Sequence, residues 1–191
     1  MSASEAVAPP TMSRVPPGRL ALWLVIASEV VLFGGLIAAY LLYRIRHPEW
    51  GDMAEHTSTP LGALNTIILL TSSFTVVMAH QAANHRDYAK ASKLLLLTVL
   101  GGAGFLIVKS IEYTHEIHNG FTITSGLFWS FYYVMTGLHA LHVIIGMIAM
   151  LAVALMVRKG LHPEAVEMAG LYWHFVDVVW IFLFPLLYIA Q

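Results

Sequence analysis

Long apolar runs alternate along the chain with short polar segments, and this pattern predicts membrane-spanning helices. A helix needs about 20 mostly apolar residues to cross the hydrocarbon core of a bilayer. Five segments meet this requirement: residues 20–43, 61–83, 93–115, 126–157 and 170–190. Backbone groups in lipid need hydrogen bonds within their own segment, and the alternation over about ten residues that is typical of β-barrel strands is missing. The predicted fold class is therefore all-α, a polytopic membrane bundle of five transmembrane helices.

Small residues and one proline modify this picture within the spans. Small residues let helix backbones approach closely, so we expect tight helix packing at Gly34-Gly35 and at Gly101-Gly102. Pro185 lies inside the last apolar run and is expected to kink that helix, because proline removes a backbone donor.

Composition supports a membrane protein with little mass outside the bilayer. Of the 191 residues, 58% are hydrophobic and 11% are charged, against roughly 25% charged residues in soluble domains. The mean hydropathy is +0.73. The chain has no cysteine, which excludes a disulfide framework, thiolate metal sites and a cysteine nucleophile.

Lysine and arginine are unevenly divided between the two sides of the predicted bundle. Seven fall on one side: Arg14, Arg19, Arg86, Lys90, Lys93, Arg158 and Lys159. The other side carries only Arg44 and Arg46. Because cytoplasmic loops are enriched in lysine and arginine, we predict a cytoplasmic N-terminus and an external C-terminus. Residues 1–18 are polar, rich in proline and without a short apolar core before a cleavage site, so we expect a disordered cytoplasmic arm. Residues 19–191 then form a single domain.

Ionisable residues inside the apolar runs are the main candidates for function. They are Glu29, Lys109, Glu112 and Asp177. An ionised carboxylate at the centre of a bilayer is costly, so such residues usually face protein or water and mark function. Glu29 has two readings, which the sequence leaves open. It is either a buried neutral acid that donates a hydrogen bond between helices, or a proton-relay or regulatory site.

Histidine and glutamate occur in patterns that resemble metal sites, but no pattern is complete. Glu112-x-x-His115 matches half of a di-iron carboxylate site, which needs a second such pair and two further glutamates. His-Pro-Glu occurs at residues 47–49 and 162–164, in both cases in a predicted loop. His139 and His142 lie one turn apart on one helix, a spacing that equally suits hydrogen bonds between helices. We therefore predict that the chain binds no metal.

The remaining polar residues of the spans are interpreted as a structural network. Its predicted members are His139, His142, His174, Asp177, Trp173, Trp180 and Glu112. His174 and Asp177 lie three residues apart and so share one helix face. We expect them and the two indoles to be hydrogen-bonded to facing polar groups such as His139 or His142.

Five ordered runs resemble subunit III of the haem-copper terminal oxidases. They are Ile26–Phe33, Leu64–His80, Glu112–Ile123, Thr136–Gly146 and Trp173–Trp180. The match resembles the five-helix bacterial form and covers nearly everything after residue 20. The familiar mitochondrial form has seven helices, with two more at its N-terminus.

This resemblance implies an accessory subunit in the inner (plasma) membrane of a bacterium. It would pack against oxidase subunits I and II, which would carry the haem and copper, and would hold no redox centre of its own. The resemblance further implies phospholipid binding, with Arg158 at the position of a lipid-binding arginine and Lys159 beside it, and support of proton uptake. Glu29 matches a reactive glutamate of the family. Nucleic acid is not expected as a partner.

Two other functions are consistent with the same sequence. A homologous small membrane protein accompanies nitric oxide reductases and would share the fold. An independent transporter or proton channel would use the intramembrane charges, but no inverted repeat or pair of broken helices supports it.

Overall fold

The computed structural model describes residues 17–189, and these residues are helical with short connections. The elements are α1 (Pro17–Arg46), α2 (Trp50–Glu55), α3 (Thr59–Asn84), α4 (Tyr88–His118), α5 (Leu127–Arg158), α6 (Ala165–Phe184) and the π-helical turn η1 (Pro185–Ile189). No strand occurs between residues 17 and 189, and five helices there are long and apolar enough to cross a membrane. The predicted all-α fold class and the five spans are confirmed. The predicted arm lies outside the described residues except at Pro17 and Gly18, which begin α1.

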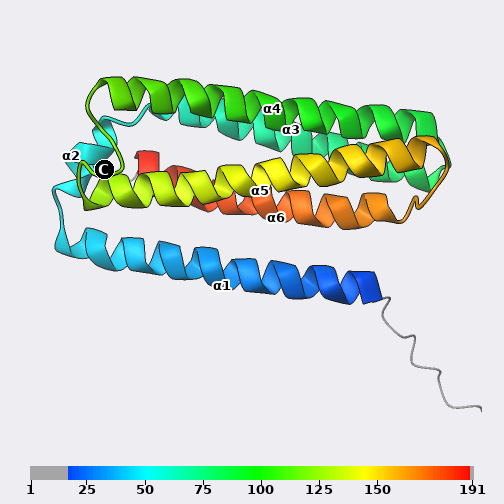
Figure 1. The fold of residues 1–191 in the computed structure, drawn as a ribbon, viewed down its shortest axis with the longest axis horizontal. Helices are drawn as coiled ribbons and strands as arrows, with labels where there is room; N and C mark the ends of the chain where they lie inside the picture. The colour runs from blue at the N-terminus through cyan, green and yellow to red at the C-terminus, as the bar shows by residue number, and fades with distance from the viewer. Residues whose placement is uncertain (1–16, 190–191) are drawn as a thin grey trace, which may run out of the picture.

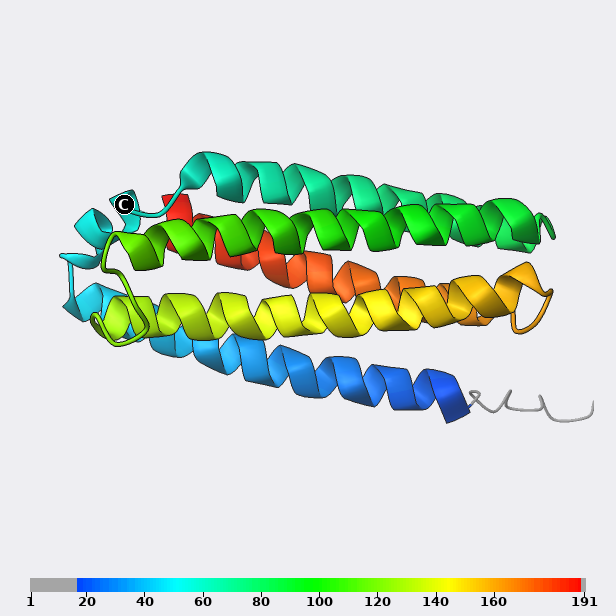
Figure 2. The ribbon, with the colours of Figure 1, turned by 45° about the horizontal axis from the view of Figure 1, so that its top comes forward.

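Helices α3, α4, α5 and α6 form a closed four-helix bundle. Each packs against its neighbour along the chain, and α6 returns to pack against α3 (Figures 1 and 2). The connections are short, so consecutive long helices run antiparallel. We call the end that holds loops 85–87 and 159–164 the basic end, because most of the loop lysines and arginines lie there. The opposite end holds α2, loop 119–126 and η1.

Helix α1 lies outside this bundle, along α6 and α5 (Figure 1). In the 18-residue apolar stretch of α1, only 6% of the residues are buried inside the protein, against 50% in the corresponding stretch of the last span. Phe33 and Tyr40 are its two buried large side chains among the described residues. A long apolar helix with so little protein contact must be covered by lipid or by another protein.

Left-handed residues end three of the long helices. Gly120 (φ 88°) follows α4 and Gly160 (φ 74°) follows α5, and in each case the next amide closes a six-residue turn. The N–H of Phe121 donates to Glu116 O at 2.9 Å, and that of Leu161 donates to Met156 O at 3.1 Å. Glycine adopts this conformation without a Cβ clash, so the two loops turn sharply back into the membrane. Arg86 (φ 62°) takes the same role after α3 without being glycine.

Pro185 changes the last helix from α to π. The last carbonyl groups of a helix lack partners within it, and those of η1 accept hydrogen bonds from side chains of other segments. Tyr40 donates to Leu186 O at 3.0 Å, and Thr59 donates to Tyr188 O at 3.2 Å. Thr57 donates to Leu187 O at a longer 3.5 Å. These hydrogen bonds connect η1 to α1 and to residues 57–59.

The small residues of the bundle helices pack as predicted, whereas those of α1 do not. A Cβ on Gly101 would lie 2.7 Å from Ser72 Cβ, and one on Gly102 would lie 2.8 Å from both Met147 and Trp173. By contrast, nothing lies within 4 Å of a Cβ built on Gly34 or Gly35. Tight packing at these two glycines is therefore a wrong expectation for the chain by itself, because α1 turns this face away from the bundle.

Candidate functional site

A buried cluster of charged residues lies on one face of α4. Lys109, Glu112 and Glu116 follow each other at spacings of three and four residues, which places them on the same side of the helix. All three are buried, with exposed fractions of 2%, 0% and 0%. The Lys109 ammonium lies 3.1 Å from Glu112 Oε2. A buried charge without a partner is strongly unfavourable, so this pairing is the condition for Lys109 to lie inside the bundle.

Two tyrosines from other helices complete what we call the charge cluster (Lys109, Glu112, Tyr132 and Tyr188). Lys109 donates to Tyr132 Oη at 3.0 Å and also contacts Tyr188 Oη. The Tyr132 hydroxyl in turn donates to Glu112 Oε1 at 2.7 Å. Aromatic faces surround the ammonium, with the Tyr132 ring centroid 4.6 Å away. The cluster therefore ties α4, α5 and η1 together through hydrogen bonds in a dry interior.

Glu116 extends this cluster toward the opposite end of the bundle. Neither of its carboxylate oxygens has a hydrogen-bond partner among residues 17–189. The nearest basic group is the His115 ring, whose Nδ1 lies 4.0 Å from Glu116 Oε1. Sequence reasoning named Lys109 and Glu112 but missed Glu116, Tyr132 and Tyr188. The spacing of Glu116 after Glu112 was a readable signal, whereas nothing in the sequence placed the two tyrosines beside Lys109.

The polar side chains of α6 meet α3, and this differs from the partners expected on α5. The Trp173 indole donates to Ser72 Oγ at 3.0 Å, and the Trp180 indole donates to Thr66 Oγ1 at 3.0 Å. His174 Nδ1 lies 2.6 Å from Ser73 Oγ. The expected hydrogen bonds from these residues to His139 or His142 are not formed in the described part of the chain. Hydroxyl groups of α3 take that place because α3 is the neighbour of α6 in the bundle.

His139 is buried among aromatic rings and has no polar partner. Its ring lies 5.3 Å from Phe105, edge to face, and 5.2 Å from Trp180. Neither ring nitrogen has a hydrogen bond within residues 17–189. His139 thus packs as a core aromatic residue, apart from the hydrogen bonds that join α6 to α3.

Glu29 and His142 form the polar contact between α1 and α5. Glu29 Oε2 lies 3.0 Å from His142 Nε2. The other nitrogen, Nδ1, donates to Leu138 O at 2.7 Å. Glu29 Oε2 is buried, and its approach to the ring does not have the geometry of a hydrogen bond within residues 17–189. The contact places a carboxyl group and an imidazole side by side between α1 and α5.

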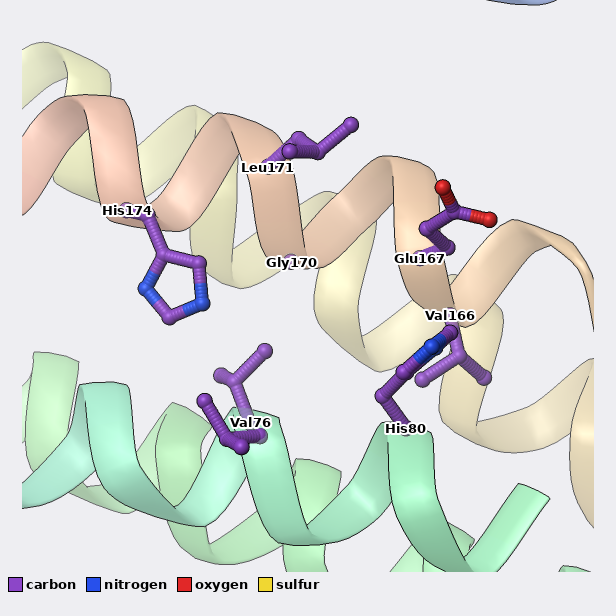
Figure 3. A pocket seen from close by; sticks show the side chains of 8 residues that line it. Val76, His80, Val166, Glu167, Gly170, Leu171 and His174 are labelled. Atoms are coloured by element: carbon purple, nitrogen blue, oxygen red, sulfur yellow. The ribbon is translucent and has the colours of Figure 1, made fainter. Parts of the chain in front are cut away.

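A groove opens between α3 and α6 near the basic end, with a volume of about 170 Å³. His80 of α3 and His174 of α6 point into the space between the two helices, and Gly170 leaves its wall without a side chain (Figure 3). Glu167 also lines the groove, but its carboxylate points away from α3 and is paired with Arg19 of α1 (Figure 3). Asp177 lies one turn beyond His174 and is 4% exposed.

The patterns that resemble metal sites do not converge in space. No group of three or more histidine, aspartate or glutamate side chains placed to hold a metal ion occurs within residues 17–189. In Glu112-x-x-His115, the glutamate side chain is 0% exposed and the histidine side chain 68%, so the two point in different directions.

Both His-Pro-Glu triplets are local loop contacts. His47 Nδ1 lies 2.7 Å from Glu49, and His162 Nδ1 lies 3.1 Å from Glu164. The glutamates stand at the N-cap positions of α2 and α6. A backbone hydrogen bond at its own residue and the neighbouring histidine lower the pKa of each carboxyl. The triplets therefore mark helix starts.

Arg158 and Lys159 end α5 at the basic end, and both are exposed. Neither forms an ion pair with another residue of the described chain. An apolar groove of about 380 Å³ lies nearby, between α1, α5 and α6. Its lining includes Leu22, Ile145, Ala149, Val153, Met168 and Tyr172.

These features define a class of protein: a multi-pass helical membrane protein with charged residues paired inside a four-helix bundle and one loosely attached span. The family comparison specifies this class. A family model described as cytochrome c oxidase subunit III matches residues 11–191. The chain belongs to this family.

Similar proteins carry the names of two kinds of oxidase. Cytochrome c oxidase subunit 3 of Thermostichus vulcanus is 39% identical over 175 residues, which cover 89% of this chain and 86% of the relative. The protein of the same name from Corynebacterium diphtheriae is 37% identical, over 87% of this chain and 84% of its own length. Quinol oxidase subunit 3 of Bacillus subtilis is 32% identical, over 89% of this chain and 85% of the relative. The resemblance inferred from the five sequence runs is confirmed.

Proposed function

We propose that this chain is a subunit of a membrane terminal oxidase that supports the catalytic subunits and carries no redox centre itself. The observation that carries the proposal is the family match, which extends over residues 11–191 and so includes all five spans. Catalysis then belongs to the assembly. Subunits I and II hold the haem and copper, pass electrons to oxygen and move protons outward across a bacterial plasma membrane.

The positions of the polar side chains support a role without a redox centre. His142 faces Glu29, His174 faces Ser73, and His139 lies between aromatic rings. These imidazoles are distributed over three separate contacts rather than gathered around one point. Their arrangement suits helix association, for which polar side chains contribute about 0.6 kcal/mol each on average in membranes.

The exposed side of α1 supports an assembled protein. Trp23, Val31, Leu42 and Ile45 are 56%, 75%, 64% and 80% exposed on this helix. The open Gly34 and Gly35 lie on the same span and would let another helix approach closely. We place the contact with the other oxidase subunits on this side of the chain.

Purification of the tagged chain in mild detergent tests the proposal. We expect haem-bearing subunits to copurify and the preparation to consume oxygen with reduced cytochrome c or with a quinol as electron donor. Isolation of a stable, haem-free oligomer that transports ions would overturn it. A complex that reduces nitric oxide but not oxygen would assign the chain to nitric oxide reductase.

Phospholipid binding is the second part of the proposal, at Arg158 and Lys159. Their charges stand where anionic headgroups lie, and the apolar groove between α1, α5 and α6 offers room for an acyl chain. Basic residues near a membrane surface attract anionic lipid by about 1 kcal/mol each. Support of proton uptake is the third part of the proposal, with Glu29, which lies beside His142 between α1 and α5, as the acid concerned.

Lipid analysis of variants of the complex tests this part. Arg158→Ala is expected to weaken the retention of anionic phospholipid by roughly fivefold, the equivalent of about 1 kcal/mol. Lys93→Ala is the matched control, because Lys93 is an exposed basic residue at the same end on α4. Equal lipid retention in both variants would leave Arg158 as an ordinary topology charge and refute the site.

A further inference from the structure

The two halves of α1 differ in how closely they pack against the bundle. No side chain between residues 18 and 32 is buried, whereas Phe33 and Tyr40 are buried. Figures 1 and 2 show α1 diverging from α5 and α6 toward its N-terminal end. Residues 18–32, which we call the loose half, therefore lie beside the bundle without entering its core.

Residues 33–46, the anchored half, fasten α1 to the end of the bundle opposite the basic end. Tyr40 donates a hydrogen bond to a carbonyl of η1 and packs against Trp50, with ring centroids 5.5 Å apart. Phe33 packs edge to face against the His142 ring at 5.2 Å. Because these contacts combine buried apolar surface with a hydrogen bond, this half has a fixed position.

Two polar contacts hold the loose half in place. Arg19, which is 46% exposed, pairs with Glu167 of α6 near the basic end. Deeper in the span, Glu29 Oε2 lies 3.0 Å from His142 Nε2, but without the geometry of a hydrogen bond. An exposed ion pair contributes little to stability, and a buried acceptor without a donor is unfavourable. The position of the loose half beside the bundle is therefore only weakly favoured.

Open space separates the loose half from the bundle. The groove of about 380 Å³ between α1, α5 and α6 is lined on its α1 side by Gly18 and Leu22. A second cavity, of about 340 Å³, lies at the Arg19–Glu167 pair. Displacement of the loose half changes the size of both spaces and leaves the buried core of the bundle intact.

Gly34 and Gly35 lie next to the boundary between the two halves. Nothing lies within 4 Å of a Cβ built on either glycine, so packing within the chain does not require glycine there. Glycine inside a helix is destabilising relative to alanine, and helices bend at pairs of small residues that include glycine. Two adjacent glycines at this boundary are therefore suited to a bending point.

We propose that the loose half of α1 is a gate that bends at Gly34-Gly35 and has the Arg19–Glu167 pair as its latch. In the closed state the latch holds the helix beside α6. In the open state both polar contacts of the loose half separate, and the groove between α1, α5 and α6 widens near the basic end. The gate controls the access of a phospholipid acyl chain to this groove, so its use rests on the proposed lipid binding.

Distances between spin labels on paired cysteines test the gate in the purified full chain in lipid nanodiscs, since the chain has no natural cysteine. Leu24→Cys with Lys93→Cys reports on the loose half, and Ile45→Cys with Ile111→Cys reports on the anchored half. All four side chains are exposed. We expect a short and a long distance for the first pair and a single distance for the second.

The latch is tested by removing its charge. Glu167→Gln is expected to raise the population of the long distance in the first pair about twofold, the size of the loss of one exposed ion pair. Glu164→Gln is the matched control, because Glu164 is an exposed glutamate nearby that contacts His162 rather than α1. An unchanged population in Glu167→Gln, or the same change in both variants, would overturn the latch.

The bending point is tested by stiffening the helix. Gly34→Ala combined with Gly35→Ala is expected to remove the long distance of the first pair, also when Glu167→Gln is present. The purified chain has no partner subunits, so this effect is separate from the docking of another helix on α1. Persistence of the long distance would overturn the hinge. A matching long distance in the second pair would do the same, because α1 would then move as one body.

The gate and the lipid site can fail separately, because the label distances are measured without a lipid assay. If Arg158→Ala and Lys93→Ala retain lipid equally, the groove loses its proposed ligand, whereas the bending of α1 still stands on the distances. Conversely, a single distance for the first pair in the unmodified background and in Glu167→Gln refutes the gate and leaves phospholipid binding in place.

Discussion

Lys109 shows how a single charged side chain can be held inside a membrane bundle. Its ammonium is bonded to one carboxylate and two phenols and is surrounded by aromatic faces. The hydrogen bonds replace those of water, and Glu112 supplies the opposite charge. The groups depend on one another, because removing one leaves the others buried without a partner.

We predict that Lys109→Met lowers the free energy of unfolding by about 3–5 kcal/mol, because it leaves the Glu112 carboxylate uncompensated. The double variant Lys109→Met with Glu112→Gln should recover most of this loss, since it removes both charges. Denaturant titration of the purified chain in mixed micelles measures the differences. Equal losses in the single and double variants would show that packing of the lysine stem, rather than charge, sets the stability.

Helix packing in the bundle depends on where side chains are small. The Trp173 ring lies over Gly146 of α5, and a Cβ on that glycine would come within 2.8 Å of the ring. The same indole is hydrogen-bonded to Ser72 of α3. Trp173 therefore fills the space between three helices and cannot move away from one without losing contact with another.

The substitution Gly146→Ala is expected to destabilise the bundle by about 1–3 kcal/mol, the usual effect of overpacking a core. Measured on the purified chain without its partner subunits, Gly34→Ala is the matched control on α1, where the added Cβ meets open space. In that control the better helix propensity of alanine, worth about 1 kcal/mol, should leave the free energy of unfolding equal or higher. A similar loss in both variants would contradict the distinction between a packed bundle and an open α1.

The sequence predicted the long helices well and their irregular ends poorly. Five apolar runs were enough to place all five spans, because the length and hydropathy of each span can be determined from its own segment of the sequence. The six residues of α2 are too few to give a periodic signal, so this helix was missed. Pro185 did predict a disturbed last helix, but not that hydroxyls of Tyr40 and Thr59 would bond the carbonyls of η1.

In the assembled membrane protein, the basic end and the opposite end differ in charge. Loops 85–87 and 159–164 carry basic residues, whereas loop 119–126 carries none. The positive-inside rule predicts that the basic end faces the cytoplasm. The Arg19–Glu167 pair would face the same side.

Cysteine labelling in intact cells measures this orientation directly, because the natural chain has no cysteine. Asn119→Cys should react with a membrane-impermeant maleimide added outside, since this exposed residue lies at the opposite end. Lys159→Cys should react only after the cells are permeabilised. The reverse labelling pattern would invert the predicted topology.

The polar residues that α6 contributes to its contact with α3 could be predicted from the sequence, but their partners on α3 could not. Helix periodicity showed that His174 and Asp177 share a face, and membrane energetics marked Asp177 as important. Periodicity does not say which helix that face meets. The order of helices around the bundle placed Ser72 and Ser73 there, and small hydroxyl side chains give no sequence signal strong enough to anticipate it.

The charge cluster has a consequence for the order in which the protein is made. Tyr188 follows Lys109 by 79 residues, so at about 5–20 residues per second the ribosome supplies it roughly 4–16 s later. Glu112 accompanies Lys109 within the same helix, and Tyr132 emerges next. The last phenol arrives only with η1, after α4 has already entered the membrane. A nascent chain that stalls in between carries an incompletely solvated lysine in the bilayer, which distinguishes it from a finished subunit.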